Sequence, residues 1–317
     1  MSFTANSSVA RLLDAVFPSA DAHRLLAVLE IHPDIMNEAG EACSRAVISQ
    51  ALNIGLLHDL LGRVPTAKSY VNDLAESGGT LVFDHGALRT VDLDGMGDLP
   101  RGEESITRLL TPMGYVLAGT YPLDKLKMTG RAYKHRDYPE QLPQFFVSEL
   151  HVGEFSEAFE AAVKRVTSGS IDPLESDTTG ALDRLSGAGS LPFADSVRLL
   201  RAALRCFSRQ HPIPALSDYE TLLAESPEMA WIATEGNAFN HATNRVASLE
   251  AVVKEQVSKG RTVKENIEVS SSGRVRQTAF KADRVKRMFS DDSQAIVVRD
   301  VPGSFFEFIE RDVMPDS

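Results

Sequence analysis

The sequence predicts a mixed α+β fold built from two similar modules, each with the order strand, helix and three strands (βαβββ). From Ser8 to about Gly78, apolar residues recur at helical spacing, which indicates a helical N-terminal segment. After this segment the βαβββ order of patterns occurs once and then occurs again further along, with helices between. We therefore expect an N-terminal segment at 1–78, modules at 79–153 and 229–317, and connecting helices and a linker at 154–228.

The first module is predicted from five consecutive patterns. TLVFDHGALRTV (80–91) is short and rich in β-branched and apolar residues, as strands are. SITRLLTPM (105–113) has a helical pattern that ends at Gly114. Three strand-like runs follow, namely YVLAGTY (115–121), KMTGRAYKH (127–135) and PQFFVSELHV (143–152).

The connection and the second module follow from the same kinds of pattern. EAFEAAVKRV (157–166) predicts a helix, the Gly, Ser, Asp and Pro content of 168–192 predicts an exposed connection, and two further helical stretches lie around 193–209 and 217–225. AWIATEGNAFNHATNRV (230–246) then predicts a strand with a loop, and SLEAVVKEQVSK (248–259) predicts an amphipathic helix. The last strand candidates are IEVSSSG (267–273), RVRQTAFKA (274–282), AIVVRD (295–300) and SFFEFIER (304–311).

Composition restricts the classes of function. A chain of 317 residues with 43% hydrophobic side chains buries enough surface to fold without a disulfide or metal staple. A formal net charge of -11 argues against a nucleic-acid partner, because that binding needs many cationic contacts to phosphate. Cys43 and Cys206 are too few for a disulfide framework and suit the cytosol. No signal peptide or membrane span is expected, and the P-loop, GxGxxG, GxSxG and HExxH motifs are missing.

A repeated motif supplies the candidate site. FDHGALR (83–89) and FNHATNR (239–245) share the form F-x-H-x-x-x-R, which places His85 and His241 at corresponding positions of the two modules. The last strand of each module offers a carboxylate: Glu149 lies 64 residues after the first histidine, and Glu307 lies 66 residues after the second. Each of the two glutamates shares its strand face with a preceding phenylalanine.

These residues predict a metal site. Two imidazoles and one carboxylate form the facial triad of non-haem Fe(II) oxygenases, and His85, His241 and Glu307 are the expected ligands. One carboxylate on a divalent ion leaves a net charge of +1, which favours an anionic chelating ligand such as a 2-oxo acid. Glu149 remains the rival carboxylate, and Glu310 is expected on the opposite strand face. A single strand histidine is, by itself, more often an ordinary core or surface residue.

Arg89 is the predicted substrate-binding and catalytic cation. It lies four residues after His85 on the same strand face, about 13 Å along the strand. Its guanidinium at that distance suits the far carboxylate of a dicarboxylic substrate, with a surface arginine as the alternative. Arg245 is the lower-ranked equivalent in the second module.

Two weaker candidates have ordinary explanations that are favoured. Gln277 is expected to make a cross-strand hydrogen bond rather than a substrate contact. A basic cluster is expected to be a solvated strand end before a turn, and it comprises Arg131, Lys134, His135 and Arg136.

The segments VFDHGALRTV, MGYVLAGTYPLDKLKMTGRAYKHRDYPEQLPQFFVSELHV, NAFNHATNR, RQTAF and PGSFFEFIER resemble the 2-oxoadipate dioxygenase/decarboxylase family over about residues 10–312. The resemblance implies a vicinal-oxygen-chelate-like half-barrel of paired βαβββ units and a mechanism related to that of hydroxymandelate synthase. It implies metal ligands at His85, His241 and Glu307, a substrate-binding Arg89, and conversion of 2-oxoadipate and dioxygen into 2-hydroxyglutarate and carbon dioxide in lysine breakdown. Longer members continue further past the last ligand, whereas this sequence ends ten residues after it.

Two alternative functions stay open at this point. The first is a metal-dependent isomerase or lyase of the same fold, with Zn(II) or Ni(II) and without dioxygen. The second is a non-catalytic protein that binds a small ligand between the modules, since fold alone does not fix function. Fe(II) is the expected metal, although the Irving–Williams order predicts that Ni or Zn competes for the site in purified protein. The oligomeric state is not predicted.

Overall fold

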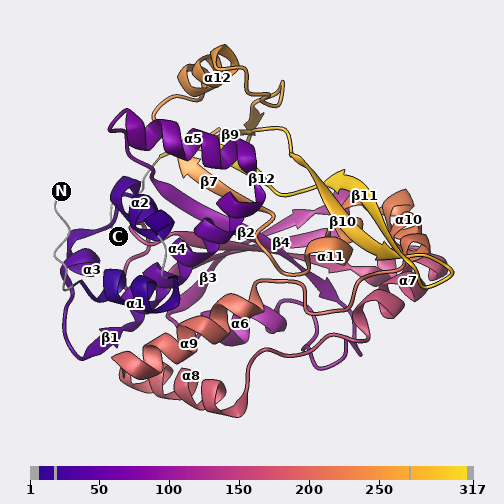
Figure 1. Cartoon of the computed structure of the whole chain (residues 1–317), viewed down its shortest axis with the longest axis horizontal. Coiled ribbons are helices and arrows are strands. Elements are labelled where there is room, and N and C mark those ends of the chain that lie inside the picture. Colours follow the sequence, from indigo (N-terminus) through magenta and orange to yellow (C-terminus); the bar gives the residue numbers. More distant parts are fainter. Residues whose placement is uncertain (1–6, 18–19, 271–272, 313–317) are drawn as a thin grey trace.

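A computed structural model describes residues 7–17, 20–270 and 273–312 of the chain, and the elements are labelled in Figure 1. The expected helical N-terminal segment consists of α1 (Ser8–Val16), α2 (Ala20–Val28), α3 (Pro33–Asn37), α4 (Arg45–Arg63) and α5 (Pro65–Glu76). It also contains a short strand, β1 (Ala42–Ser44), which pairs with the equally short β6 (Ser190–Pro192). Some parts of the expected segments lie outside the described residues, namely positions 1–6, 18–19, 271–272 and 313–317.

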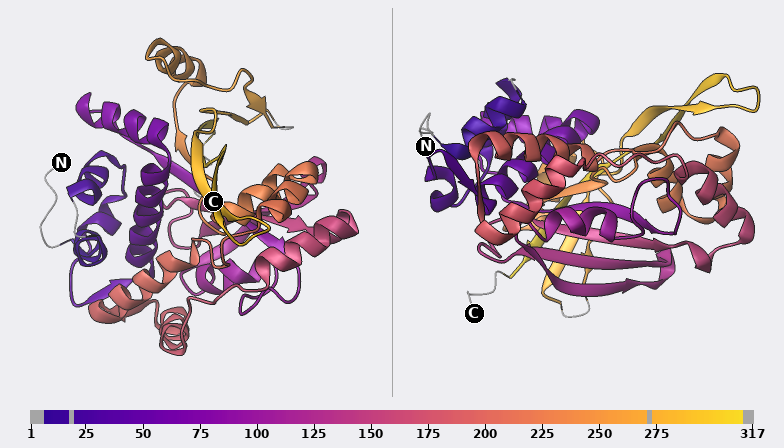
Figure 2. Two further views of the ribbon diagram at one scale, coloured as in Figure 1. Left: turned by 45° about the vertical axis from the view of Figure 1, so that its right-hand side comes forward. Right: turned by 90° about the horizontal axis from the view of Figure 1, so that it is seen from below.

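The centre of the molecule is an eight-stranded sheet that curls into a half-barrel (Figure 2). In spatial order its strands are β3 (Tyr115–Leu123), β4 (Met128–His135), β5 (Gln144–His151), β2 (Phe83–Asp92), β7 (His241–Arg245), β12 (Phe305–Arg311), β9 (Val275–Ala279) and β8 (Glu268–Val269). Strands β2 and β7 are antiparallel and join the two halves, while β2 pairs with β5, and β7 with β12, in parallel.

The two halves of the sheet have the same topology. One is built from β2, α6 (Glu104–Leu110), β3, β4 and β5, and the other from β7, α12 (Leu249–Ser258), β8, β9 and β12. Reading outward from the β2–β7 junction, both halves run first strand, last strand, third strand and second strand. The predicted α+β fold with two βαβββ modules is therefore confirmed.

Residues 168–192 do not form the exposed connection that their composition predicted. They contain α8 (Ser176–Ala188), which buries Ala181, Leu182 and Leu185. Gly189, at a φ of 74°, ends this helix. The helical spacing of three apolar residues therefore outweighed the local Gly and Ser content. The other connecting helices are α7 (Glu157–Thr167), α9 (Phe193–Cys206) and α10 (Leu216–Glu225).

One prediction for the second module was wrong, and another was incomplete. The segment 230–235 is not part of a strand but belongs to α11 (Pro227–Glu235), because Ser226 caps the helix by accepting a hydrogen bond from the backbone N–H of Met229. A hairpin of β10 (Arg284–Ser290) and β11 (Ile296–Pro302), half of which sequence reasoning missed, is inserted between β9 and β12. The hairpin projects from the sheet beside α10 (Figure 1).

The two faces of the sheet are covered by different helices. On the outer face, Leu88 and Phe306 belong to a large core with the N-terminal helices, α6, α8 and α9. On the inner face, Val91 and Leu150 pack at one end against α7, α10 and α11. None of the helices among the described residues combines the length and apolarity needed to span a membrane.

Candidate metal centre

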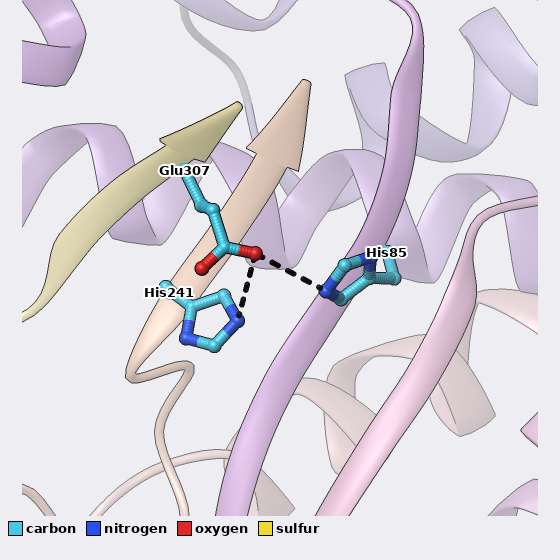
Figure 3. Close-up of side chains that lie close together, drawn as sticks. All are labelled: His85, His241 and Glu307. Carbon is cyan, nitrogen blue, oxygen red and sulfur yellow. Dashed lines mark ion pairs between the residues drawn. The ribbon is translucent and has the colours of Figure 1, made fainter. Parts of the chain in front are cut away.

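Three strands bring His85, His241 and Glu307 together on the inner face of the sheet. His85 is on β2, His241 starts β7, and Glu307 is the third residue of β12. In register, His85 lies opposite Thr243, and Thr243 lies opposite Glu307, so these positions form one cross-strand row. Figure 3 shows the three side chains pointing toward a common point.

The ligand atoms are close enough to share one ion. The Nε2 atoms of His85 and His241 each lie 3.9 Å from Oε1 of Glu307, and all three atoms are within 4.8 Å of one another. Ligand atoms that share a metal at about 2.1 Å lie roughly 3 Å apart in neighbouring coordination positions. Small side-chain rotations are therefore sufficient to close the triad around a divalent cation.

Burial sets the protonation of two of the three residues. Desolvation, followed by the charges of His85, Arg89 and Lys264, holds the pKa of His241 well below its usual value. The imidazole is therefore neutral at neutral pH and keeps a lone pair for a metal. Desolvation also raises the pKa of Glu307, against the opposing influence of neighbouring cations and of a hydrogen bond from Thr243. A bound cation would stabilise the ionised carboxylate in this setting.

The surrounding polar atoms fit a metal as well. The hydroxyl of Thr243 donates to Oε1 of Glu307 at 3.3 Å and lies 3.1 Å from Nε2 of His85. Nδ1 of His241 is buried and has no hydrogen-bond partner among the described residues, so only Nε2 is directed at another polar group of the site. Phe305 stacks on the His241 ring at 4.8 Å between centroids and holds its plane. Two imidazoles and an acid directed at one point suit Fe(II) and related divalent ions.

Asp84 is a residue of the site that sequence reasoning missed. Its Oδ2 lies 3.1 Å from Nδ1 of His85, and its Oδ1 accepts hydrogen bonds from Nε of Arg245 at 2.8 Å and of Arg311 at 2.7 Å. Burial by itself raises the pKa of Asp84. His85 and the two arginines lower the pKa by a larger amount, so the net value lies well below the usual range. The carboxyl group is therefore ionised behind His85.

Arg89 lies on the inner face beside a cavity of about 180 Å³, which Trp231, Asn240 and Phe305 also line. Its guanidinium stands 5.2 Å from the centroid of the Trp231 ring, and no hydrogen bond or ion pair joins it to another described residue. Burial lowers the pKa of Arg89 to about 10, with Glu228 opposing the shift, so the side chain stays cationic. Because Phe305 also stacks on His241, this cationic cavity adjoins the metal centre.

Glu149, the rival carboxylate, lies on the opposite face of the sheet. It pairs in register with Thr90, one residue past Arg89, whereas Glu307 shares the face of His241. Its Oε1 is 3.1 Å from Nη1 of Arg131, and its Oε2 accepts a hydrogen bond from the backbone N–H of Glu103 at 2.7 Å. Phe145, which shares a strand face with Glu149, lies on the outer face of the sheet, whereas Phe305, which shares a face with Glu307, lies on the inner face. Matching spacing along the two strands therefore did not mean matching orientation.

A second group of two acids and a histidine consists of Asp92, Glu149 and His151, and its polar atoms already have partners. Asp92 pairs with Arg101, and His151 binds Thr129 through Nε2 at 2.8 Å and approaches Asp92 through Nδ1 at 3.4 Å. These contacts satisfy the atoms that would face a cation. The group is therefore an ion-pair network and not a rival metal centre.

The remaining sequence candidates lie outside the triad. Arg245 is occupied by Asp84, and Gln277 donates to Glu268 across the strands at 3.3 Å, as expected. Glu310 faces away and accepts a hydrogen bond from the N–H of Leu249 at the start of α12. Within the basic cluster, Arg131 pairs with Glu149, Lys134 and Arg136 are exposed, and His135 is buried against the carbonyl of Met113.

The sequence model of the 2-oxoadipate dioxygenase/decarboxylase family matches residues 55–316. The chain belongs to this family. It is therefore an enzyme of the 2-oxoadipate dioxygenase/decarboxylase class. The 2-oxoadipate dioxygenase/decarboxylase of Oryza sativa subsp. japonica is 27% identical over 304 residues, which span 89% of this chain and 72% of that protein. The corresponding protein of Arabidopsis thaliana is 25% identical and spans 87% and 70%.

Comparison with solved structures shows that this chain has the glyoxalase-like fold. A putative glyoxalase superfamily protein from Ralstonia eutropha JMP134 is 50% identical, with a TM-score of 0.93 over 96% of this chain and 95% of that one. The hydroxyglutarate synthase of Oryza sativa, solved in complex with 2-oxoadipate, is 22% identical with a TM-score of 0.63 and covers 84% and 81%. At that identity the second likeness shows the fold alone.

Proposed function

We propose that this enzyme converts 2-oxoadipate and dioxygen into 2-hydroxyglutarate and carbon dioxide, with Fe(II) held by His85, His241 and Glu307. The observation that supports this most strongly is the convergence of the three ligand atoms next to a cavity with an unpaired guanidinium. Fe(II) in such a triad would supply the binding and reduction of dioxygen. The expected setting is lysine breakdown in the cytosol, and the two buried free cysteines are consistent with a reducing compartment.

The residues of the site match the two ends of the substrate. With two imidazoles and one carboxylate as ligands, a divalent cation in this triad would carry a net charge of +1, which would attract the 1-carboxylate and 2-oxo oxygens. Arg89 then binds the distal carboxylate with its planar fork of donors. A substrate fixed at both ends has its methylene chain along the inner face between β2 and α11.

The overall conversion balances without another oxidant. Carbon 1 leaves as carbon dioxide, the keto carbon becomes the new carboxylate, and the neighbouring methylene becomes the carbinol. The two atoms of one dioxygen molecule enter the new carboxylate and the hydroxyl group. No external 2-oxo acid is consumed, so the protein has to hold one small molecule and keep bulk water away from it. Phe305 and Trp231 provide apolar walls for that purpose.

The test is oxygen consumption by the Fe(II)-loaded enzyme with 2-oxoadipate, followed by mass spectrometry of the product. We expect one 2-hydroxyglutarate and one carbon dioxide per dioxygen consumed. A panel of 2-oxo acids without any turnover would refute the proposal. Turnover under strict anaerobiosis would indicate the isomerase or lyase alternative instead, and purified protein that takes up no metal would indicate a binding protein.

A further inference from the structure

Strand β2 departs from regular geometry at Asp84. The register of the β2–β7 pair shifts between Phe83, which lies opposite Asn244, and His85, which lies opposite Thr243. In a regular strand, neighbouring side chains point to opposite faces, so Asp84 and His85 would not meet. The extra residue at this bulge re-aims the side chain, and Oδ2 of Asp84 comes to 3.1 Å from Nδ1 of His85.

The charge of Asp84 is held in place by two arginines. Arg245 and Arg311 both donate to Oδ1, and the Asp84 side chain is only 3% exposed. Arg311 also forms an ion pair with Glu140 at 3.1 Å, so the two arginines face two carboxylates and their charges are balanced. Oδ2 is therefore left for His85, because the arginines occupy the other oxygen.

From this geometry we infer that Asp84 is a positioning residue for the metal ligand His85. By accepting the hydrogen bond from Nδ1–H, it keeps the proton on that nitrogen and the lone pair on Nε2, which faces Glu307. A carboxylate behind an imidazole also makes the ring a stronger donor to a cation. The inference rests on the metal centre proposed above and adds a residue to it.

The other imidazole has no such support. Nδ1 of His241 finds no acceptor among the described residues, and the ring is held by stacking on Phe305. The two histidines of the repeated motif are therefore unequal ligands. We expect His85 to be the ring whose orientation is fixed before the metal arrives, so that loss of Asp84 weakens metal binding without removing any ligand.

The test substitutes Asp84→Asn and measures binding of Co(II) and Zn(II) by competition with a chelator. We expect the dissociation constant to rise roughly 10- to 100-fold, with a changed Co(II) absorption spectrum, because the His85 ring is no longer held in one orientation. The substitution also leaves Arg245 and Arg311 with Glu140 as their one remaining acidic neighbour among the described residues, and this surplus positive charge lowers stability. The double variant Asp84→Asn/Arg311→Leu removes this surplus charge, because Arg245 and Glu140 then balance, and it should regain stability but not metal affinity.

The matched control is Asp172→Asn, since Asp172 forms an equally close pair with Arg108, at 2.6 and 2.7 Å, away from the triad. It should lose stability and bind metal as the wild type does. Wild-type affinity and spectrum in Asp84→Asn would overturn the inference, as would recovery of affinity in the double variant. A wild-type protein that binds neither ion would overturn the metal centre itself, which separates the two failures.

Discussion

Replacing Arg89 with methionine gives the sharpest separation of substrate binding from stability. The substitution removes the cation and keeps an unbranched side chain of similar length next to Trp231. Truncating one partner of a desolvated charge pair costs about 2–5 kcal/mol. That loss corresponds to a decrease in kcat/KM for 2-oxoadipate of roughly 30-fold to several thousand-fold. For 2-oxohexanoate, which lacks the distal carboxylate, kcat/KM should hardly change.

The same substitution should stabilise the folded protein. The fall of the Arg89 pKa from 12.5 to about 10 means that burying the cation costs about 3 kcal/mol at neutral pH. This penalty is present wherever the arginine is protonated in both the folded and unfolded chain, that is, below about pH 10. Since the side chain keeps some exposure in its cavity, about 3 kcal/mol is the upper limit of the gain from Arg89→Met.

Oxygen-electrode kinetics with both substrates and urea unfolding at pH 7.5 check the two expectations together. Arg108→Met is the matched control, because it breaks a bidentate pair with Asp172 and should lose stability while keeping the ratio of the two kcat/KM values. If Arg89→Met were less stable than the wild type and still discriminated between the two acids, the assignment of Arg89 to the distal carboxylate would be wrong.

Three further variants probe the site and its support. His241→Ala should abolish metal binding and leave the unfolding transition cooperative, because the removed ring has an unpaired buried Nδ1; full metal uptake, measured by elemental analysis, would contradict its assignment as a ligand. Gly86→Ala should lower the free energy of unfolding by about 1–3 kcal/mol in urea titrations, because the added Cβ would meet the ring of Phe239 at 2.2 Å, and an unchanged value would show that the ring moves freely. Burial lowers the pKa of His135 and of His211 to about 4 from 6.5, so each remains neutral in the folded protein while it binds a proton in the unfolded chain. The stability that they contribute is complete above pH 6.5 and falls as the pH decreases, by about 2 kcal/mol each at pH 5. His135→Gln should flatten this dependence between pH 7.5 and 5, and an unaltered slope would exclude His135 as its source.

The fold was largely predictable because its repeat is visible in local patterns. Strands β2, β4, β5 and β12 were expected within a few residues of their positions, since their apolar and β-branched composition agrees with burial on the sheet. Helix α8 was missed because its Gly and Ser content disguised three buried apolar residues. The β10–β11 hairpin was only half expected, because RVKRMFS in β10 mixes charged and apolar residues and packs on one face only.

The predictions for the site depended on chemistry that a linear sequence carries and on geometry that it does not. The repeated motif was sufficient to single out His85 and His241 as a pair, because its two copies occupy related positions across the β2–β7 junction. The choice between Glu149 and Glu307 needed the strand register, which spacing alone does not determine. Asp84 could not be found, because strand periodicity places it on the face opposite His85 and only the bulge reverses that.

The register also explains why a symmetric scaffold holds an asymmetric site. One cross-strand row runs from His85 through Thr243 to Glu307, and the neighbouring row runs from Phe146 through Ala87 to His241. If one half of the sheet is superimposed on the other, Glu307 of the second module therefore falls on Phe146 of the first. A second carboxylate at that place would cancel the net charge of +1 and weaken the hold on an anionic 2-oxo acid.

The phenyl ring instead leaves an apolar stretch of the inner face between the three proposed metal ligands and Arg89. Phe146 and Ala87 lie in the row next to His85, and Arg89 lies two residues further along β2. A ligand that follows this direction would meet the proposed metal ion, then hydrocarbon, then the guanidinium of Arg89. That order matches an acid with a chelating 2-oxo end, a short methylene chain and a distal carboxylate, and it arises because only one of the two modules contributes an acid to the row.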